Sequence, residues 1–138
     1  MSDRLVELVR LRVAFHNQCR SCMAIRYKDA VADGVTEALV CSLEKPADAA
    51  HLTPAERIAI DFADRFATDH LSISDATYDE LRRHFTEGEI VELGMTVAFF
   101  VGFGRLSTTL DMTEELPAAF RDHTRTLTPW REASIQVR

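Results

Sequence analysis

Residues 5–15 read LVELVRLRVAF, and this stretch decides the fold class because it is apolar at nearly every position. Only Glu7, Arg10 and Arg12 interrupt the run of leucine, valine, alanine and phenylalanine. A helix that is apolar almost all round belongs in the interior of a protein rather than on its surface. We therefore expect residues 5–15 to form a buried helix.

The residues after this stretch predict a second helix that carries two cysteines. The polar run His16-Asn17-Gln18 breaks the apolar pattern, and Asn17 is a suitable N-cap. The expected helix runs from Cys19 to Ala32. Gly34, two residues later, suits the left-handed position that follows a helix end. A short third helix is expected from Thr36 to Leu43.

Further along the chain, the helix starts are marked by capping signals. Thr53-Pro54-Ala55-Glu56 combines a capping box with proline at the first helical position. Ser74 is expected to cap a helix that continues through Phe85. A second capping box, Thr86 to Glu89, opens a long apolar helix towards Leu110.

Strands are not expected, because no segment alternates apolar and polar residues between turn residues. The fold class is therefore all-α, as a single domain of 138 residues. We assign residues 1–110 to a helical domain and residues 111–138 to a C-terminal extension.

Charge and hydropathy indicate which partners and which cellular compartment to expect. The net charge of −6 disfavours a nucleic-acid surface. The apolar stretch Leu93 to Phe103 is shorter than the roughly 20 residues that cross a bilayer, so we expect a buried helix and no membrane partner. No secretory signal precedes the first helix, which predicts a cytoplasmic protein.

Cys19 and Cys22 are the residues best suited to carry chemistry. Three residues apart on a helix, their sulfurs share one face, within reach of a disulfide if the first turn adjusts. A helix N-terminus favours the thiolate form, and Arg20 and Arg26 add positive charge. The alternative is that two small cysteines fill a core. A zinc site needs about four ligands and only His16 and Cys41 are candidates to join, so we expect neither a metal nor a cofactor.

Glu7 stands out because a charge inside an apolar helix is costly unless it is paired. If the chain reverses near Asn17, Glu7 and Arg26 lie at nearly the same height, at about 1.5 Å per residue. This geometry predicts a Glu7–Arg26 pair beside the thiols; the alternative is that Glu7 reaches solvent at a helix edge. Of the five histidines, only His16 is close to the cysteines in sequence.

Taken together, these motifs resemble the carboxymuconolactone decarboxylase superfamily, and within it the AhpD-like alkylhydroperoxidase branch. The resemblance covers roughly residues 4 to 110. The segments that carry it are Glu7 to Ala14, Cys19-x-x-Cys22, Ala30-x-x-x-Gly34-Val35-Thr36, Leu52 to Arg57, Phe85 to Leu93, and Gly104-Arg105-Leu106.

The resemblance implies an all-α bundle that assembles as trimers, hexamers or related oligomers. It also implies a peroxidatic Cys22, a resolving Cys19 and a proton relay through Glu7. Cys22 would attack a hydroperoxide, and Cys19 would then close the disulfide. An unidentified thiol would supply the electrons.

This sequence departs from the family pattern at Arg26, where that pattern has a histidine. Arginine stays protonated and cannot shuttle a proton, although it can hold a thiolate and Glu7 electrostatically. The leading hypothesis is an AhpD-like thiol-disulfide oxidoreductase with hydroperoxide-reducing activity. The alternatives are a lyase that uses Glu7, Arg26 and His16 on a small anionic substrate, and a non-catalytic redox-sensing oligomer.

A homo-oligomer, either a trimer or hexamer or else a dimer, is expected from the apolar helix near the C-terminal third. Phe99, Phe100 and Phe103 are more aromatic surface on one helix than a single small domain needs to bury; the alternative is that they belong to a core within one chain. Proteins of the family that this sequence resembles usually carry additional helical residues before the segment equivalent to Glu7, so the N-terminal end is the other surface that an oligomer is expected to cover.

Overall fold

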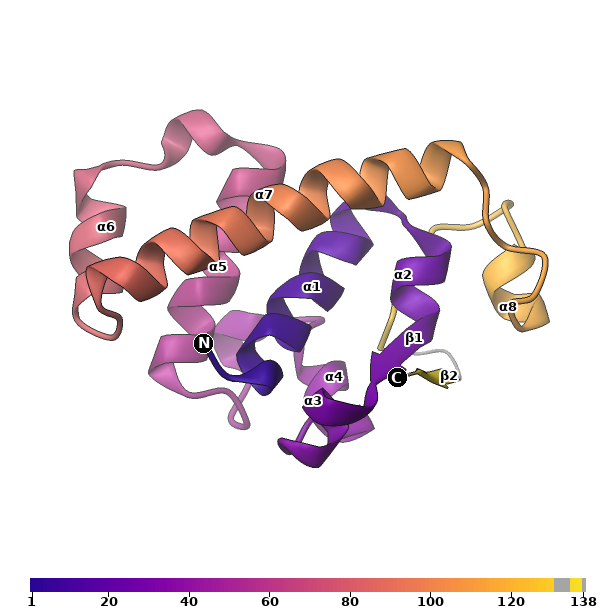
Figure 1. Cartoon of the computed structure of the whole chain (residues 1–138), viewed down its shortest axis with the longest axis horizontal. Helices are drawn as coiled ribbons and strands as arrows, with labels where there is room; N and C mark the ends of the chain where they lie inside the picture. Colours follow the sequence, from indigo (N-terminus) through magenta and orange to yellow (C-terminus); the bar gives the residue numbers. More distant parts are fainter. Residues whose placement is uncertain (131–134, 138) are drawn as a thin grey trace.

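The computed structural model describes residues 1–130 and 135–137, which are helical along most of their length (Figure 1). Residues 131–134 and Arg138 of the expected C-terminal extension lie outside the described residues. In chain order the elements are α1 (Asp3–Asn17), α2 (Arg20–Ala24), β1 (Ile25–Tyr27), α3 (Lys28–Ala32), α4 (Glu37–Ser42), η1 (Pro46–Asp48), α5 (Pro54–Thr68), η2 (His70–Ser72), α6 (Asp75–Arg82), α7 (Glu87–Thr109), α8 (Ala118–Arg121) and β2 (Ile135–Val137).

Helix α1 lies at the centre and takes part in each apolar cluster of the described residues. Val9 and Val13 pack with residues of α5, α6 and α7. Leu8 and Leu11 pack with α3, α4 and α5, and Ala14 packs with α2 and α8. The prediction of a buried helix over residues 5–15 is confirmed, because neighbours surround α1 on several sides.

The capping signals fix the later helices where the sequence predicted them. Thr53 and Glu56 form the reciprocal capping box at the start of α5, and Thr86 and Glu89 form another at the start of α7. Helix α6 follows Ser74 as expected but ends at Arg82, three residues before Phe85. These signals act within one turn of helix, so they need no distant partner.

The predicted helix from Cys19 to Ala32 is wrong as a single element. Asn17 is the last residue of α1 rather than an N-cap, and α2 ends at Ala24. The chain then runs extended through β1 before α3 resumes the helix. The expectation of no strands is corrected at the same place.

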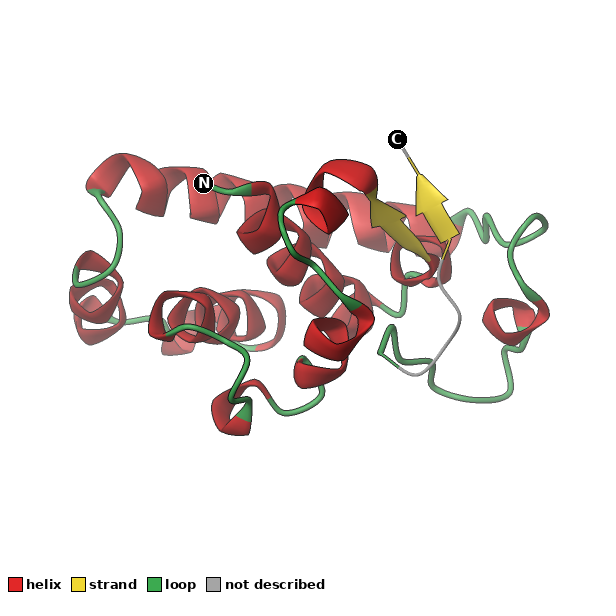
Figure 2. Cartoon of the chain, turned by 90° about the horizontal axis from the view of Figure 1, so that it is seen from below, coloured by secondary structure: helices red, strands yellow, loops and turns green. Residues whose placement is uncertain are grey.

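The extended segment exists because a distant part of the chain pairs with it. Strands β1 and β2 form a two-stranded parallel sheet, with Ile25 opposite Ile135 and Tyr27 opposite Val137. Figure 2 shows the two arrows side by side at the edge of the helical body. Partners 110 residues apart leave no local signal, so the sequence pattern alone predicted a continuous helix.

Helix α7 runs along the molecule and covers α1 and α5 with one face only (Figure 1). Leu93 and Val97 are buried, but Phe99 and Phe103 are 59% and 50% exposed. The expectation of a buried helix over Leu93 to Phe103 is therefore confirmed for the inner face of α7 and corrected for its outer face. Among the described residues α7 alone is long and apolar enough to cross a membrane, and 33% of its apolar window is buried inside the protein.

Candidate functional site

A tight reversal of the chain places the two cysteines. Helix α1 ends at Asn17, and Gln18 takes the left-handed conformation, with φ 49° and ψ 34°. The backbone N–H of Cys19 then donates to the Ala14 carbonyl at 3.0 Å. Cys19 becomes the N-cap of α2, so the cysteine pair opens a short helix that lies against α1.

Cys19 and Cys22 are joined in a disulfide, with their Cα atoms 5.2 Å apart, as their spacing predicted. The backbone N–H of Cys22 points at the Cys19 sulfur, at 3.4 Å. Cys19 is only 1% exposed, whereas Cys22 is half-buried. The two sulfurs are therefore not equivalent: one is sealed inside the protein, and the other is within reach of solvent.

Cys22 opens onto an apolar pocket of about 230 Å³ between α1, α2 and α7. Its apolar walls include Ile25, Phe100, Phe103 and Met112, and Arg10 is the charged residue of the lining. Such a pocket favours an apolar molecule with one polar group. The pocket therefore offers Cys22 the kind of space that an organic substrate needs.

The predicted Glu7–Arg26 pair is wrong, because the partner of Glu7 is Arg10. The Arg10 guanidinium donates to both Glu7 carboxylate oxygens, from Nε to Oε2 at 2.6 Å and from Nη2 to Oε1 at 2.8 Å. Glu7 and Arg10 are 2% and 3% exposed, so this is a buried, bidentate ion pair. The expectation that Glu7 needs a partner holds, but the partner is on its own helix.

Arg10 links this ion pair to the cysteine segment. Its Nη1 donates to the Cys22 carbonyl at 2.5 Å, and its Nη2 donates to the Ile25 carbonyl at 3.0 Å. The guanidinium also lies over the Tyr27 ring, 5.1 Å from the ring centroid. Arg10 thus fixes the backbone on the C-terminal side of Cys22.

Sequence reasoning missed Arg10, although a signal for it was present. Residues three apart on a helix are neighbours on one face, and Glu7 and Arg10 have that spacing. Two opposite charges inside one apolar helix are most simply paired with each other. The spacing alone therefore predicts a Glu7–Arg10 pair, whatever the path of α2.

Arg26 is 1% exposed, and its hydrogen bonds go to backbone carbonyls and Glu37 rather than to Glu7 or the thiols. Its guanidinium donates to the carbonyls of Met23, Ile25 and Pro129 and forms an ion pair with Glu37. Burial lowers the pKa of Arg26 below its ordinary value, although Glu37 acts in the opposite direction. The strand geometry explains the error, since the helix that would have aimed Arg26 at Glu7 ends at Ala24.

His16 bonds Asp64 of α5 rather than a residue of the cysteine segment. Its Nε2 lies 2.7 Å from an Asp64 oxygen, and Arg12 donates to both oxygens of the same carboxylate. Asp64 belongs to α5, so His16 faces α5 rather than the cysteines. Of the candidate site residues, Cys19 and Cys22 are bonded to each other, and Glu7 is linked to the Cys22 backbone through Arg10. His16 and Arg26 do not line the pocket of Cys22.

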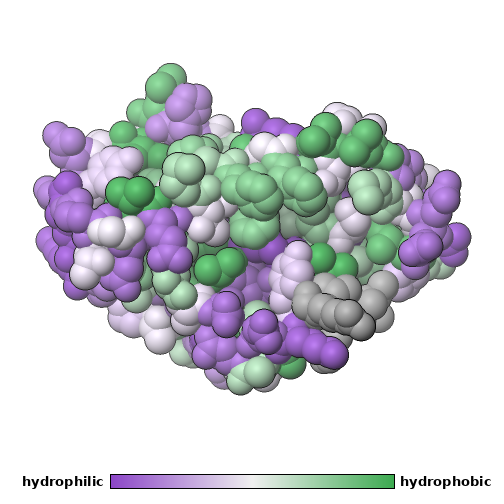
Figure 3. All heavy atoms as spheres, in the orientation of Figure 1, coloured by the Kyte–Doolittle hydropathy of each residue, from purple (hydrophilic) through white to green (hydrophobic). Residues whose placement is uncertain are grey.

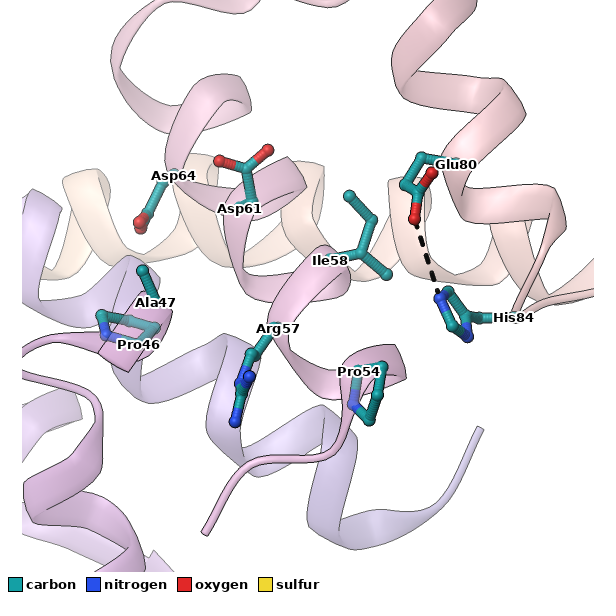
Figure 4. A pocket seen from close by; sticks show the side chains of 9 residues that line it. All are labelled: Pro46, Ala47, Pro54, Arg57, Ile58, Asp61, Asp64, Glu80 and His84. Carbon is teal, nitrogen blue, oxygen red and sulfur yellow. Dashed lines mark ion pairs between the residues drawn. The ribbon is translucent and has the colours of Figure 1, made fainter. Parts of the chain in front are cut away.

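A separate groove of about 430 Å³ lies between η1, α5 and α6, and it contains no cysteine (Figure 4). Its carboxylates are paired with neighbours, whereas Arg57 donates to the Ala49 carbonyl and its buried Nε has no hydrogen-bond partner among the described residues. Asp61 pairs with Arg65, and Glu80 lies 3.9 Å from His84. In the described part of the chain, no three His, Cys, Asp or Glu side chains are grouped to hold a metal ion. The cysteine pocket is therefore the stronger candidate site.

Two comparisons with known proteins bear on this arrangement. Residues 1–65, which include Glu7, Arg10 and both cysteines of the pair, match the model of the carboxymuconolactone decarboxylase family. The chain is also 24% identical over 105 residues to the uncharacterized protein YdfG of Bacillus subtilis (strain 168). That similarity covers 75% of this chain and 71% of the relative.

Proposed function

We propose that the protein is an AhpD-like thiol-disulfide oxidoreductase that reduces organic hydroperoxides. The premise is that residues 1–65 match the carboxymuconolactone decarboxylase family. One observation carries the proposal. The Cys19–Cys22 disulfide presents a half-buried Cys22 to an apolar pocket, while Cys19 is sealed. A nucleophile must be reachable, and its resolving partner need only be near.

The chemistry follows from this asymmetry. The Cys22 thiolate attacks the terminal oxygen of a hydroperoxide, the O–O bond breaks, and the products are a Cys22 sulfenic acid and an alkoxide that takes a proton from water. The Cys19 thiolate then attacks the Cys22 sulfur and expels hydroxide, which is protonated to water. Two thiols of a donor reduce the disulfide and become a disulfide themselves.

The buried ion pair is assigned a supporting role in this reaction. Because Arg10 occupies both Glu7 oxygens, Glu7 holds Arg10, and Arg10 holds the carbonyls of Cys22 and Ile25. The apolar walls of the pocket would take the organic group of the hydroperoxide. We therefore expect an apolar hydroperoxide to be a better substrate than hydrogen peroxide.

The geometry gives less support to the alternative of a lyase, because two of its expected site residues, Arg26 and His16, bond elsewhere. Arg26 donates to backbone carbonyls and Glu37, and His16 bonds Asp64, so neither faces the pocket of Cys22. Arg10, which does line the pocket, is neutralised by Glu7. Among the described residues, the charged side chain of the pocket lining is the paired Arg10, which supports an apolar substrate over an anionic one.

The test is turnover of cumene hydroperoxide with dithiothreitol as reductant, alongside mass spectrometry of the oxidised protein. The wild type should lose two hydrogen atoms in the peptide that carries both cysteines. Cys22→Ser and Cys19→Ser should abolish turnover, and Cys41→Ser, the matched control, should keep it. A disulfide that forms without turnover would favour the redox-sensing oligomer, and a linkage through Cys41 would overturn the proposal.

A further inference from the structure

The C-terminal extension returns to the cysteine pair instead of leading away from it. Residues 116–130, here called the C-terminal strap, include α8 and the residues that follow it up to Trp130. Phe120 and Leu127 of the strap are fully buried in one cluster with Ala14, Met23 and Ala24. Cys22 packs against the same cluster. The strap is thus part of the packing around α2.

Both sequence neighbours of Cys19 hold the strap. The Gln18 side chain donates to the Leu127 carbonyl at 3.1 Å and accepts from the Leu127 N–H at 3.0 Å. On the other side, Arg20 donates to the carbonyls of Phe120 and Arg125, at 3.2 and 3.0 Å. Cys19 lies between these two attachments, and it is 1% exposed.

Arg26 fastens the end of the strap. Its Nη2 donates to the Pro129 carbonyl at 2.6 Å, while its Nη1 donates to the carbonyls of Met23 and Ile25 at 2.9 Å. One buried guanidinium therefore joins the end of α2, strand β1 and the strap. Next to Pro129, Trp130 packs on Phe15 with ring centroids 4.8 Å apart.

We infer that Arg26 is a positioning residue that clamps the C-terminal strap over α2, so that within the cysteine pair Cys19 is sealed and Cys22 is open to reaction. The inference rests on the proposed function and specifies how electrons enter the site. A donor thiolate attacks the Cys22 sulfur, the S–S bond breaks, and Cys19 leaves as a thiolate beside the Cys22 N–H. A second donor thiolate then attacks the mixed disulfide and releases Cys22.

The clamp also explains why an arginine suits position 26, where the family pattern has a histidine. A histidine could not reach Met23, Ile25 and Pro129 at once, because it has two ring nitrogens and arginine has five N–H donors. The Arg26→His change is therefore expected to loosen the strap. It would not build a relay to Glu7, whose two oxygens Arg10 already occupies.

The test is alkylation of the fully reduced protein with iodoacetamide, with the rate at each cysteine read by peptide mass spectrometry. In the wild type Cys22 should react at least about tenfold faster than Cys19, because a sealed thiol reacts only when its cover opens. Arg26→Ala should raise the Cys19 rate at least about tenfold and change the Cys22 rate less than about threefold. Arg26→Lys should recover part of the protection.

The controls separate a local clamp from a general loss of structure. Arg121→Ala changes an exposed residue of the strap and should leave both rates unchanged. If Arg26→Ala does not fold, Gln18→Ala removes the Leu127 attachment and should raise the Cys19 rate in the same way. Equal rates at Cys19 and Cys22 in the wild type, or an unchanged ratio in the folded variants, would overturn the inference. Alkylation needs no peroxide, so loss of peroxide turnover alone would count against the proposed function only.

Discussion

At the scale of single residues, the site depends on charges buried inside the protein. Glu7 and Arg10 form an ion pair within α1. Arg10 also donates hydrogen bonds to the carbonyls of Cys22 and Ile25. Removing one partner of such a pair leaves the other charge buried without compensation, which is far more costly than breaking an exposed pair. The pair therefore couples the stability of the core to the position of Cys22.

Glu7→Gln is accordingly expected to lower the free energy of unfolding by about 3 kcal/mol, because the Arg10 charge stays buried. Guanidinium unfolding of the reduced protein measures this loss. Glu87→Gln, which breaks an exposed pair with Arg82, is the matched control and should leave stability nearly unchanged. Similar small losses in both variants would show that Glu7 is solvated, contrary to its burial.

The sequence could identify the chemistry-bearing residues but only some of their contacts. The spacing of Cys19 and Cys22 predicted the disulfide, and the apolar setting of Glu7 predicted a partner. The identity of that partner depended on where the chain runs after Ala24. Arg26 was assigned to Glu7 on the assumption of a continuous helix, and the strand β1 removes that assumption.

At the scale of elements, local signals were reliable and distant pairings were not. The boxes at Thr53 and Thr86 start α5 and α7 where predicted, because each is complete within four residues. Strand β1 instead depends on β2, and its register pairs Arg26 with Gln136. A strand held by a partner so far along the chain leaves no periodicity for the sequence to show.

The contact between α1 and α5 is held by an ionic bracket around Asp64. Arg12 and His16 of α1 both bind its carboxylate. Burial by itself would raise the pKa of Asp64, but the hydrogen bonds from His16 and Arg12 outweigh it and hold the pKa below the ordinary value. A lowered folded-state pKa means that the ionised form stabilises the fold.

This bracket predicts a specific pH dependence. The contribution of Asp64 is fully present above the unfolded-state pKa, about 3.9, and is lost as the pH falls through the lower folded-state value. The stability gap between wild type and Asp64→Asn should therefore be widest near neutral pH and narrow below about pH 4. Urea unfolding at a series of pH values measures the gap. Asp61→Asn, at a half-exposed pair with Arg65, should show a small gap throughout; a constant Asp64→Asn gap would contradict the assignment.

At the scale of the whole molecule, the outer face of α7 carries most of the large apolar side chains that are exposed among the described residues. A stripe of large apolar side chains stays more than half exposed along it: Val91, Met95, Phe99, Leu106 and Leu110. Figure 3 shows apolar residues gathered in this region. A Cβ added at Gly94 or Gly102 would meet open space, so these two positions are also uncovered. Contiguous apolar surface of this kind marks an interface.

We propose that a second copy of the chain covers this face, which is one of the two surfaces on which a homo-oligomer contact is expected. An apolar stripe on one helix is self-complementary, which suits an isologous contact between two α7 helices. Phe99 lies near the middle of the stripe and stacks on Phe103, so it should be an anchor of the contact.

Phe99→Asp should therefore shift the protein towards monomer and raise the dissociation constant at least about thirtyfold, because losing an anchor costs 2 kcal/mol or more. Sedimentation velocity at micromolar concentration measures the species present. Leu71→Asp, at an 85% exposed leucine of η2 and away from α7, should leave the assembly unchanged. A wild-type monomer would refute the contact outright. An oligomer that survives Phe99→Asp would place the interface elsewhere, with the N-terminal end of the chain as the next surface to alter.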